Sequence, residues 1–413
     1  MAGIQNYANS LAKEIEQSWR SKNFDEGCFP QIAAEGLASN PFAEELDSTS
    51  LIRFGLLHDD LSYQSNPGYP FGEPPMVLCR REFFEVGVLF WLNGTTSIHQ
   101  HSFSGAFQVL EGSSLHSEYT FHLKETINER MLLGDVCWQS SELLTKRMIR
   151  PITAGQKFIH SLFHLDKPTV TLIVRTHTES RFGPQYNYQP SGFAFDPFYK
   201  TNESTFYSRL AASLVDLRPD GFEEILRELF EKGHLEKNVK LLLSLNSVLR
   251  KGNHATRALI DMAVGKREDL KERLSKLIEE DLRTQNLATR RKDITDPNHR
   301  FLLGALMSLP NRQSILKCVS EYTESMNPIE MTIRWIRELT EGETIENVGL
   351  GIQLNHLERQ LLHGILSGLS GEKLRGHVEN RCQEEKASFS NKGFEIAMFK
   401  LPTMRVLKPF FTE

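Results

Sequence analysis

The sequence lacks the features of a membrane or secreted protein. No stretch reaches the roughly 18 consecutive apolar residues that a membrane-spanning helix requires. Residues 1–20 contain neither an apolar core nor a small-residue cleavage site, so no secretory signal is expected. Basic residues are not in excess either. A formal net charge of −5 argues against a protein whose binding is dominated by nucleic-acid phosphates. We therefore expect neither membrane nor nucleic acid as a partner.

Cysteines are few and scattered, and none forms a CxxC pair. The five are Cys28, Cys79, Cys137, Cys318 and Cys382. An odd number without metal-binding spacing is typical of reduced thiols, which indicates a cytoplasmic protein.

At 413 residues the chain is long for a single hydrophobic core, which predicts two domains. Near the N-terminus, Tyr7, Leu11, Ile15 and Trp19 recur at every fourth position, as on one face of an amphipathic helix. The rest of residues 1–74 is rich in proline, glycine, asparagine and serine, and we interpret it as loops with short helical turns that pack on the domain that follows.

In residues 75–204 the sequence pattern changes to short β-favouring runs separated by turn residues. The runs are MVLC, FFEVGVLFW, GAFQVLEG, SEYTFHL and TVTLIVRT. Short strands at this spacing predict a β-sandwich or barrel rather than βαβ units.

Residues 205–375 show apolar stripes with a period of 3.6 and predict an all-α domain. Within them, the polar segment 283–300 is expected to be a loop or linker. Residues 376–413 are expected to form an extended C-terminal tail packed on a neighbour. The predicted fold class is therefore α+β: a β-barrel domain followed by an all-α domain, whose surface is a candidate for homodimer formation.

Two histidine-bearing motifs lie in the β-rich region. In the segment 93–114, His99 and His101 are two residues apart, so on a strand both imidazoles face the same side. In the segment 151–164, a turn containing proline and glycine leads into a strand that carries His160, and His164 follows four residues later. This pattern can direct imidazole nitrogens at one interior ion.

Together these motifs resemble the two conserved motifs of the cupin superfamily. The matching positions are Gly94, His99, His101, Gly112, Pro151, Gly155 and His160. The resemblance implies a jelly-roll β-barrel with one divalent metal on His99, His101 and His160. His164 occupies the cupin asparagine position, where it either supports His160 or replaces it as the ligand.

Gly105 stands where most cupins place a carboxylate ligand. A three-histidine site without a carboxylate resembles the thiol dioxygenases of the cysteine dioxygenase family. That resemblance implies Fe(II) and a reaction with O2, although imidazole ligands also suit Zn, Ni and Cu.

The same resemblance suggests residues around the metal. In that family an arginine near the start of the barrel binds the substrate carboxylate, and Arg80 has the matching position. The family's Ser-x-His-x-Tyr triad aligns with Thr171, Ile173 and Arg175, so its histidine and tyrosine are absent and cysteine itself is doubtful as substrate. Arg175 is expected to face the same way as Thr171. Its anionic partner is either the substrate or an acidic residue such as Glu179.

Two other histidines of this region, His116 and His122, are expected at the surface. The leading hypothesis is a mononuclear non-haem iron oxygenase that uses O2 on a small, anionic organic substrate. A metal-binding cupin that acts as a sensor or interaction module is the alternative, and a metal-dependent isomerase or hydrolase is a third. Metal identity and O2 uptake separate these readings.

Overall fold

The structure is a computed structural model of the chain. It describes residues 2–40, 47–58, 64, 71–177, 182–199, 202–217, 221–249, 255–324, 326–341 and 349–412. Glu179, one of the partners expected for Arg175, lies outside these ranges. Among the described residues, no helix is long and apolar enough to cross a membrane.

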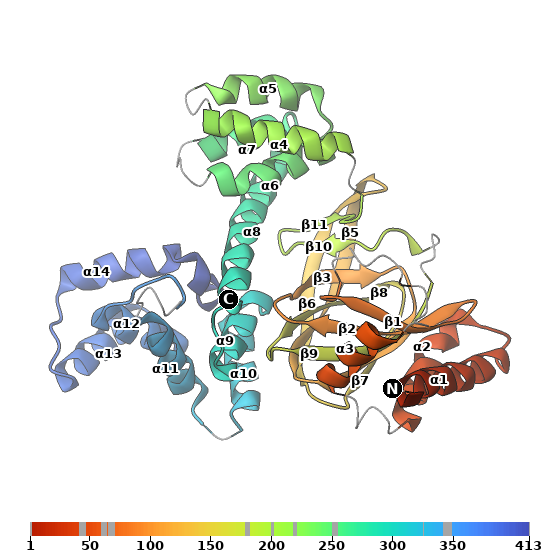
Figure 1. Cartoon of the computed structure of the whole chain (residues 1–413). Coiled ribbons are helices and arrows are strands. Elements are labelled where there is room, and N and C mark those ends of the chain that lie inside the picture. The colour runs from red at the N-terminus through yellow and green to blue at the C-terminus, as the bar shows by residue number, and fades with distance from the viewer. Residues whose placement is uncertain are drawn as a thin grey trace.

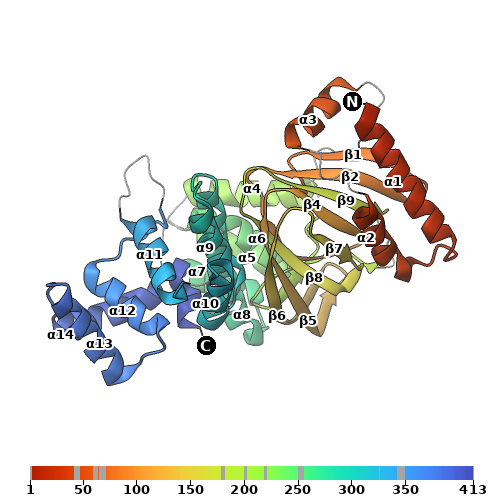
Figure 2. The ribbon, with the colours of Figure 1, turned by 90° about the horizontal axis from the view of Figure 1, so that it is seen from below.

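Three helices precede the barrel: α1 (Ala2–Arg20), α2 (Phe29–Ser39) and α3 (Ser48–Leu57). The predicted apolar stripe of α1 is confirmed, since its four residues are all buried. This stripe packs with α2 against the first strands, on the side of the barrel away from the later helices (Figure 2). The region predicted as loops with short helical turns thus contains two further helices, α2 and α3, among its described residues.

Eleven strands follow among the described residues, and they form two sheets. They are β1 (Pro75–Arg80), β2 (Phe84–Trp91), β3 (Thr96–His101), β4 (Gly105–Glu111), β5 (Ser114–Asn128), β6 (Met131–Leu144), β7 (Ile149–Ile152), β8 (Gly155–His164), β9 (Thr169–Thr176), β10 (Asn187–Tyr188) and β11 (Phe193–Phe195). One sheet has the order β1-β2-β9-β4-β7, and the other forms a closed barrel in the order β10-β11-β6-β5-β8-β3.

Eleven α-helices complete the described chain. They are α4 (Asn202–Leu217), α5 (Phe222–Lys232), α6 (Leu235–Leu249), α7 (Ala255–Val264), α8 (Lys271–Arg291), α9 (Pro297–Ser308), α10 (Arg312–Tyr322), α11 (Pro328–Thr340), α12 (His356–Leu366), α13 (Gly371–Glu384) and α14 (Asn391–Lys400). The predicted fold class, α+β with a β-barrel followed by helices, is confirmed.

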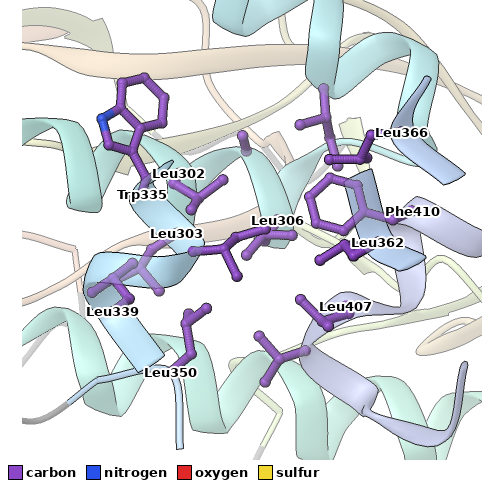
Figure 3. Packing of buried hydrophobic residues seen from close by; sticks show 14 of the residues in the cluster. Leu302, Leu303, Leu306, Trp335, Leu339, Leu350, Leu362, Leu366, Leu407 and Phe410 are labelled. Carbon is purple, nitrogen blue, oxygen red and sulfur yellow. The ribbon is translucent and has the colours of Figure 1, made fainter. Parts of the chain in front are cut away.

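The helices form two lobes joined by the long helix α8 (Figure 1). Helices α4 to α7 and most of α8 share one apolar core, which also contacts β6 and β11. Helices α9 to α14 share a second core, to which Trp335, Leu362 and Phe410 belong (Figure 3). Leu115 of β5 and Phe163 of β8 belong to this second core, so it continues onto the barrel wall.

Two predictions about the helical region are wrong. The segment 283–300 is not a loop, because α8 continues to Arg291 and α9 begins at Pro297. The last residues are not extended, because α13, α14 and a 3-10 helix at Arg405–Phe411 occupy them. Leu407 and Phe410 of that turn are buried in the second core, and this burial accounts for the helical conformation.

Two buried arginines fasten the helices to the barrel just beyond β8. Arg291 donates to the carbonyl oxygen of His164 at 2.7 Å and, over longer distances, to those of Leu92 and Asp166. Arg300 donates to the carbonyl oxygen of Leu165 at 3.0 Å. Because a buried guanidinium is costly without partners, these carbonyls fix where the helical domain sits.

Candidate metal centre

Three histidines meet inside the barrel on two neighbouring strands. His99 and His101 come from β3 and His160 from β8, and His99 lies directly opposite His160 in the antiparallel register. All three are buried, with exposed fractions of 1%, 6% and 2%. One nitrogen from each ring lies within 4.8 Å of the others. The structure therefore brings together the three histidines that were expected to bind metal.

Backbone and side-chain contacts select the nitrogens that face inward. His99 donates through Nδ1 to the carbonyl oxygen of Ser97 at 2.8 Å, which leaves Nε2 as its free acceptor. His160 turns Nδ1 toward His116 and Nε2 toward His101. Such second contacts fix ring orientation at metal sites.

Burial keeps the three rings neutral at ordinary pH. It lowers the pKa of His99 to about 4, and it lowers the pKa values of His101 and His160 well below their usual range. Neutral imidazole is the form that binds metal, because a protonated ring has no free lone pair. At ordinary pH the three rings therefore keep free lone pairs with which they could bind a cation.

The distance between two of the rings also fits a metal ion. Nε2 of His101 and Nε2 of His160 are 2.9 Å apart, and Nδ1 of His101 is buried with no hydrogen-bond partner among the described residues. Two nitrogens this close require a proton or a cation between them. The two nitrogens are therefore close enough to bind the same cation.

A cavity of about 50 Å³ adjoins the three histidines. Aromatic and aliphatic side chains make up most of its wall: Phe71, Leu89, Trp91, Phe103, Phe107, Ile152, Leu162 and Ile173. Its polar lining, apart from the histidines, consists of Thr96, Thr171, Arg175 and Gln185. At roughly 10–15 Å³ for each water, the cavity holds only a few water-sized groups. None of the described residues that line it is acidic.

Of the three residues expected around the metal, two line this cavity. Thr171 accepts a hydrogen bond from the indole Nε1 of Trp91 at 3.3 Å. Arg175 lies in the wall, but Nε and Nη2 both donate to Glu85 of β2, at 2.9 and 2.6 Å. Of the two partners expected for Arg175, a substrate anion or an acidic residue such as Glu179, the structure shows an acidic residue, Glu85. Arg80 is exposed at the end of β1 and does not line the cavity.

Gly105 has no room for a side chain of any kind. A Cβ at this position would lie 2.0 Å from the carbonyl oxygen of Val174 and 2.9 Å from Cα of Arg175, both on the adjacent strand β9. The close approach of β9 therefore requires glycine here. It also explains why a carboxylate ligand is absent from this position.

His164 lies apart from His99, His101 and His160. Its ring stacks on Trp91 at 4.5 Å, and its Nδ1 lies 2.8 Å from the hydroxyl of Ser114. It does not belong to the group of nitrogens that converge, so it does not replace His160 as a ligand in this geometry.

His116 was expected at the surface, and that prediction is wrong. It is 1% exposed, and its Nε2 lies 3.0 Å from Nδ1 of His160. The register explains this position. Glu118 is opposite His160, and His116, two residues earlier on β5, faces the same interior side. The alternation of side chains along β5 was the sequence signal that could have placed His116 inside the barrel. His122 is exposed, as expected.

Comparisons with known proteins add little beyond the fold. No family model matches the sequence, and no curated protein matches it. Among solved structures, the chain is similar to a cupin-2 domain protein from Shewanella frigidimarina (12% identity, 33% of this chain and 100% of that one, TM-score 0.19). It is also similar to the DMSP lyase DddQ from Ruegeria pomeroyi (14% identity, 36% and 72%, TM-score 0.21). A sugar phosphate isomerase of the cupin superfamily from Silicibacter pomeroyi gives 17% identity, 35% and 95% coverage and a TM-score of 0.21. Similarities this low carry no inference about activity.

Proposed function

We propose that the barrel binds one divalent metal ion, iron in its working form, on His99, His101 and His160 and acts as an oxygenase on a small anionic molecule. One observation carries this proposal: three buried, neutral imidazoles converge beside an apolar cavity. Neutral nitrogen ligands without a carboxylate are the donor set of the thiol dioxygenases that the sequence resembles.

The chain's own residues supply orientation and a dry environment. When bound, ferrous iron supplies Lewis-acid and one-electron chemistry at positions that the protein leaves open. The cavity wall is mostly aromatic and aliphatic, and such an apolar lining strengthens electrostatic interactions inside it. Thr171 offers a hydroxyl to the same space, held by Trp91.

Arg175 is the candidate for orienting an anionic substrate. Its Nε and Nη2 are occupied by Glu85, but Nη1 makes no hydrogen bond to a described residue, and the side chain is 24% exposed. Its charge is also felt at the metal site, since it contributes to the lowered pKa of His101. The family's tyrosine is absent, so we do not propose cysteine as the substrate.

The direct test is anaerobic purification and metal analysis, followed by an O2-uptake screen with small thiols and carboxylates. The wild-type protein should bind one iron per chain and consume O2 with at least one substrate class. His99→Ala, His101→Ala and His160→Ala should each lose most of the metal and retain the fold, with the exposed His122→Ala as control. Full metal occupancy in any of the three would contradict the ligand assignment. Iron binding without O2 uptake over the whole screen would refute the oxygenase.

A second candidate, a metal-dependent sensor or interaction module, has one observation in its favour. Arg291 of α8 holds the carbonyl oxygen of His164, four residues beyond His160 on the same strand, so the metal strand contacts the helical domain directly. A cleft of about 310 Å³ also lies between the barrel and the helices, with Trp138, Arg283 and Pro409 in its wall. Thr96 of β3 and Ser161 of β8 line it as well, so the cleft adjoins the two strands that carry the three histidines. For a sensor, metal binding should change amide hydrogen exchange in α8 and α9 without O2 uptake.

A further inference from the structure

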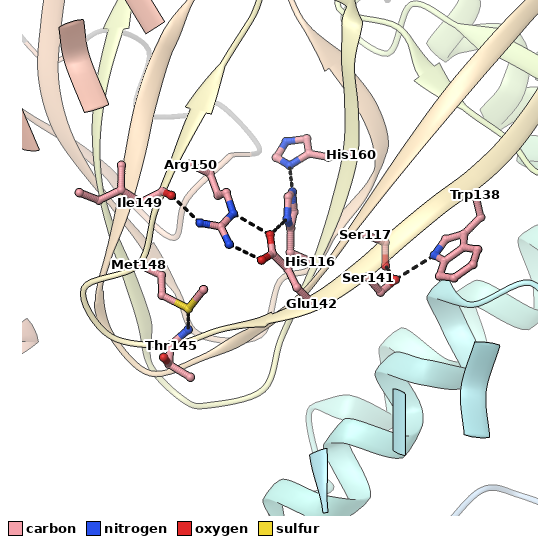
Figure 4. Close-up of polar contacts among 10 residues, drawn as sticks. All are labelled: His116, Ser117, Trp138, Ser141, Glu142, Thr145, Met148, Ile149, Arg150 and His160. Carbon is pink, nitrogen blue, oxygen red and sulfur yellow. Dashed lines mark hydrogen bonds and ion pairs between the residues drawn. The ribbon is translucent and has the colours of Figure 1, made fainter. Parts of the chain in front are cut away.

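A buried polar chain leads from the metal site to the barrel wall. Nδ1 of His160 lies 3.0 Å from Nε2 of His116, and Nδ1 of His116 lies 3.0 Å from Oε1 of Glu142 (Figure 4). Arg150 then donates through Nε to the same oxygen at 2.6 Å and through Nη2 to the other carboxylate oxygen. The chain thus joins β8, β5, β6 and β7.

The fold places these residues by strand register. His116 and Glu142 are directly opposite on β5 and β6, so both side chains lie on the same face. Arg150 belongs to the other sheet, where β7 pairs with β4. The Arg150–Glu142 ion pair therefore bridges the two sheets. It is partly exposed, whereas the His116 side chain is fully buried.

The direction of each hydrogen bond follows from the acidic end. The hydrogen bonds from His116 and Arg150 lower the pKa of Glu142 to about 2, so the carboxylate can only accept. His116 must therefore donate through Nδ1, and in the neutral ring Nε2 is then the acceptor. A neutral His160 carries one ring proton, and an acceptor at 3.0 Å holds that proton on Nδ1.

We propose that His116, anchored by Glu142 and Arg150, is a positioning residue that holds His160 in the Nδ1–H tautomer, with Nε2 presented to the metal. The inference rests on the proposed function only in taking His160 as a metal ligand. It adds a residue that sequence motifs do not reveal. It also assigns a role to a strand, β5, that carries no ligand.

A competing interpretation is that His116, Glu118 and Glu142 form a second metal site, because their ligand atoms also lie close together. Two contacts speak against it. Arg150 occupies both oxygens of Glu142, and its positive charge would repel a cation there. Nε2 of His116 is directed at His160 rather than at Glu118.

The test uses the full chain and two readouts that do not depend on O2 chemistry. The first is the tautomer of His160 in metal-free protein, from long-range proton–nitrogen correlations of histidine-labelled samples, assigned with His160→Ala. The second is the affinity for Co²⁺, followed by its absorption. Outer contacts to a metal-bound histidine typically contribute 10- to 100-fold in affinity.

His116→Leu removes the acceptor, and we expect it to lose the Nδ1–H preference of His160 and to weaken Co²⁺ binding 10- to 100-fold. His116→Gln keeps an acceptor oxygen near His160, so its Co²⁺ affinity should stay within about threefold of wild type. His122→Ala, exposed on the same strand, is the matched control and should change neither readout.

Three results would overturn the proposal. They are an unchanged tautomer with unchanged Co²⁺ affinity in His116→Leu, an equal loss in His116→Leu and His116→Gln, and a second equivalent of Co²⁺ that disappears in Glu142→Gln. If His116→Leu does not fold, Glu142→Gln gives the same test, because it weakens the anchor and should lower the Nδ1–H preference. A failed O2-uptake screen would leave both readouts unaffected, so it tests the oxygenase alone.

Discussion

Replacing Arg291 by methionine tests how much the contact between the helical domain and β8, the strand of His160, stabilises the protein. The guanidinium is fully buried and donates to three carbonyl oxygens of the barrel, at 2.7, 3.4 and 3.3 Å. It also lies 5.8 Å from the ring centre of Phe163. Methionine keeps the apolar stem and removes only the donors.

The expected cost follows from these contacts. A hydrogen bond from a charged donor contributes about 1.5–3 kcal/mol, and the two long contacts add roughly 0.5 kcal/mol each. Part of this is offset because burial disfavours the charge, as shown by the pKa of Arg291, which burial lowers to about 10. We therefore expect Arg291→Met to reduce the free energy of unfolding by about 2–3 kcal/mol.

Urea unfolding followed by circular dichroism measures this change, with Lys292→Met as control. Lys292 is the next residue, carries the same charge and is exposed, so its replacement should cost less than about 0.5 kcal/mol. Co²⁺ affinity should fall about threefold to tenfold in Arg291→Met, because the bond to His164 fixes the end of β8. Equal stabilities of the two variants would refute the docking role.

Three further predictions concern the barrel. Gly105→Ala should cost at least about 3 kcal/mol in a thermal unfolding experiment, because its Cβ meets the carbonyl oxygen of Val174. The control is Gly376→Ala, where nothing lies within 4 Å of the new Cβ, and it should stabilise the protein by up to about 1 kcal/mol. Equal effects of the two substitutions on stability would contradict the clash at Gly105. Because the pKa of Glu142 falls from 4.5 to about 2 on folding, its contribution to stability is complete above pH 4.5 and is lost as pH falls toward 2. In metal-free Glu142→Gln, the free energy of unfolding should therefore depend less on pH between 4.5 and 2. An unchanged pH dependence would count against the ion pair. His164→Ala should keep one Co²⁺ per chain, and loss of that ion would make it a ligand.

The convergence of His99, His101 and His160 could be predicted because its signal is local. Two histidines two residues apart on a strand must face the same side, and a turn that leads into the strand of His160 completes the pattern. The barrel and the helices could likewise be predicted, because the spacing of apolar residues changes from short β-favouring runs to a period of 3.6 residues. These features depend only on residues close to one another in the sequence.

Partners across the sheets could not be predicted, because they depend on register. Glu85 faces Arg175 only through the pairing of β2 with β9, and Glu142 faces His116 only through the pairing of β5 with β6. The polar segment 283–300 was misleading for a related reason. Arg291 and Arg300 are polar but buried, since the carbonyl groups that they bind belong to the barrel.

The distribution of charge around the cavity bears on the substrate. Both arginines near the site are paired with a carboxylate: Arg175 with Glu85 and Arg150 with Glu142. Each pair is neutral as a whole, and the three histidines are neutral because burial lowers their pKa values. The charge of a divalent ion on these ligands would therefore remain uncompensated by the described residues around it. In an apolar cavity such a charge favours an anionic partner. This supports an anionic substrate more strongly than Arg175 does alone, since Glu85 already offsets the guanidinium charge.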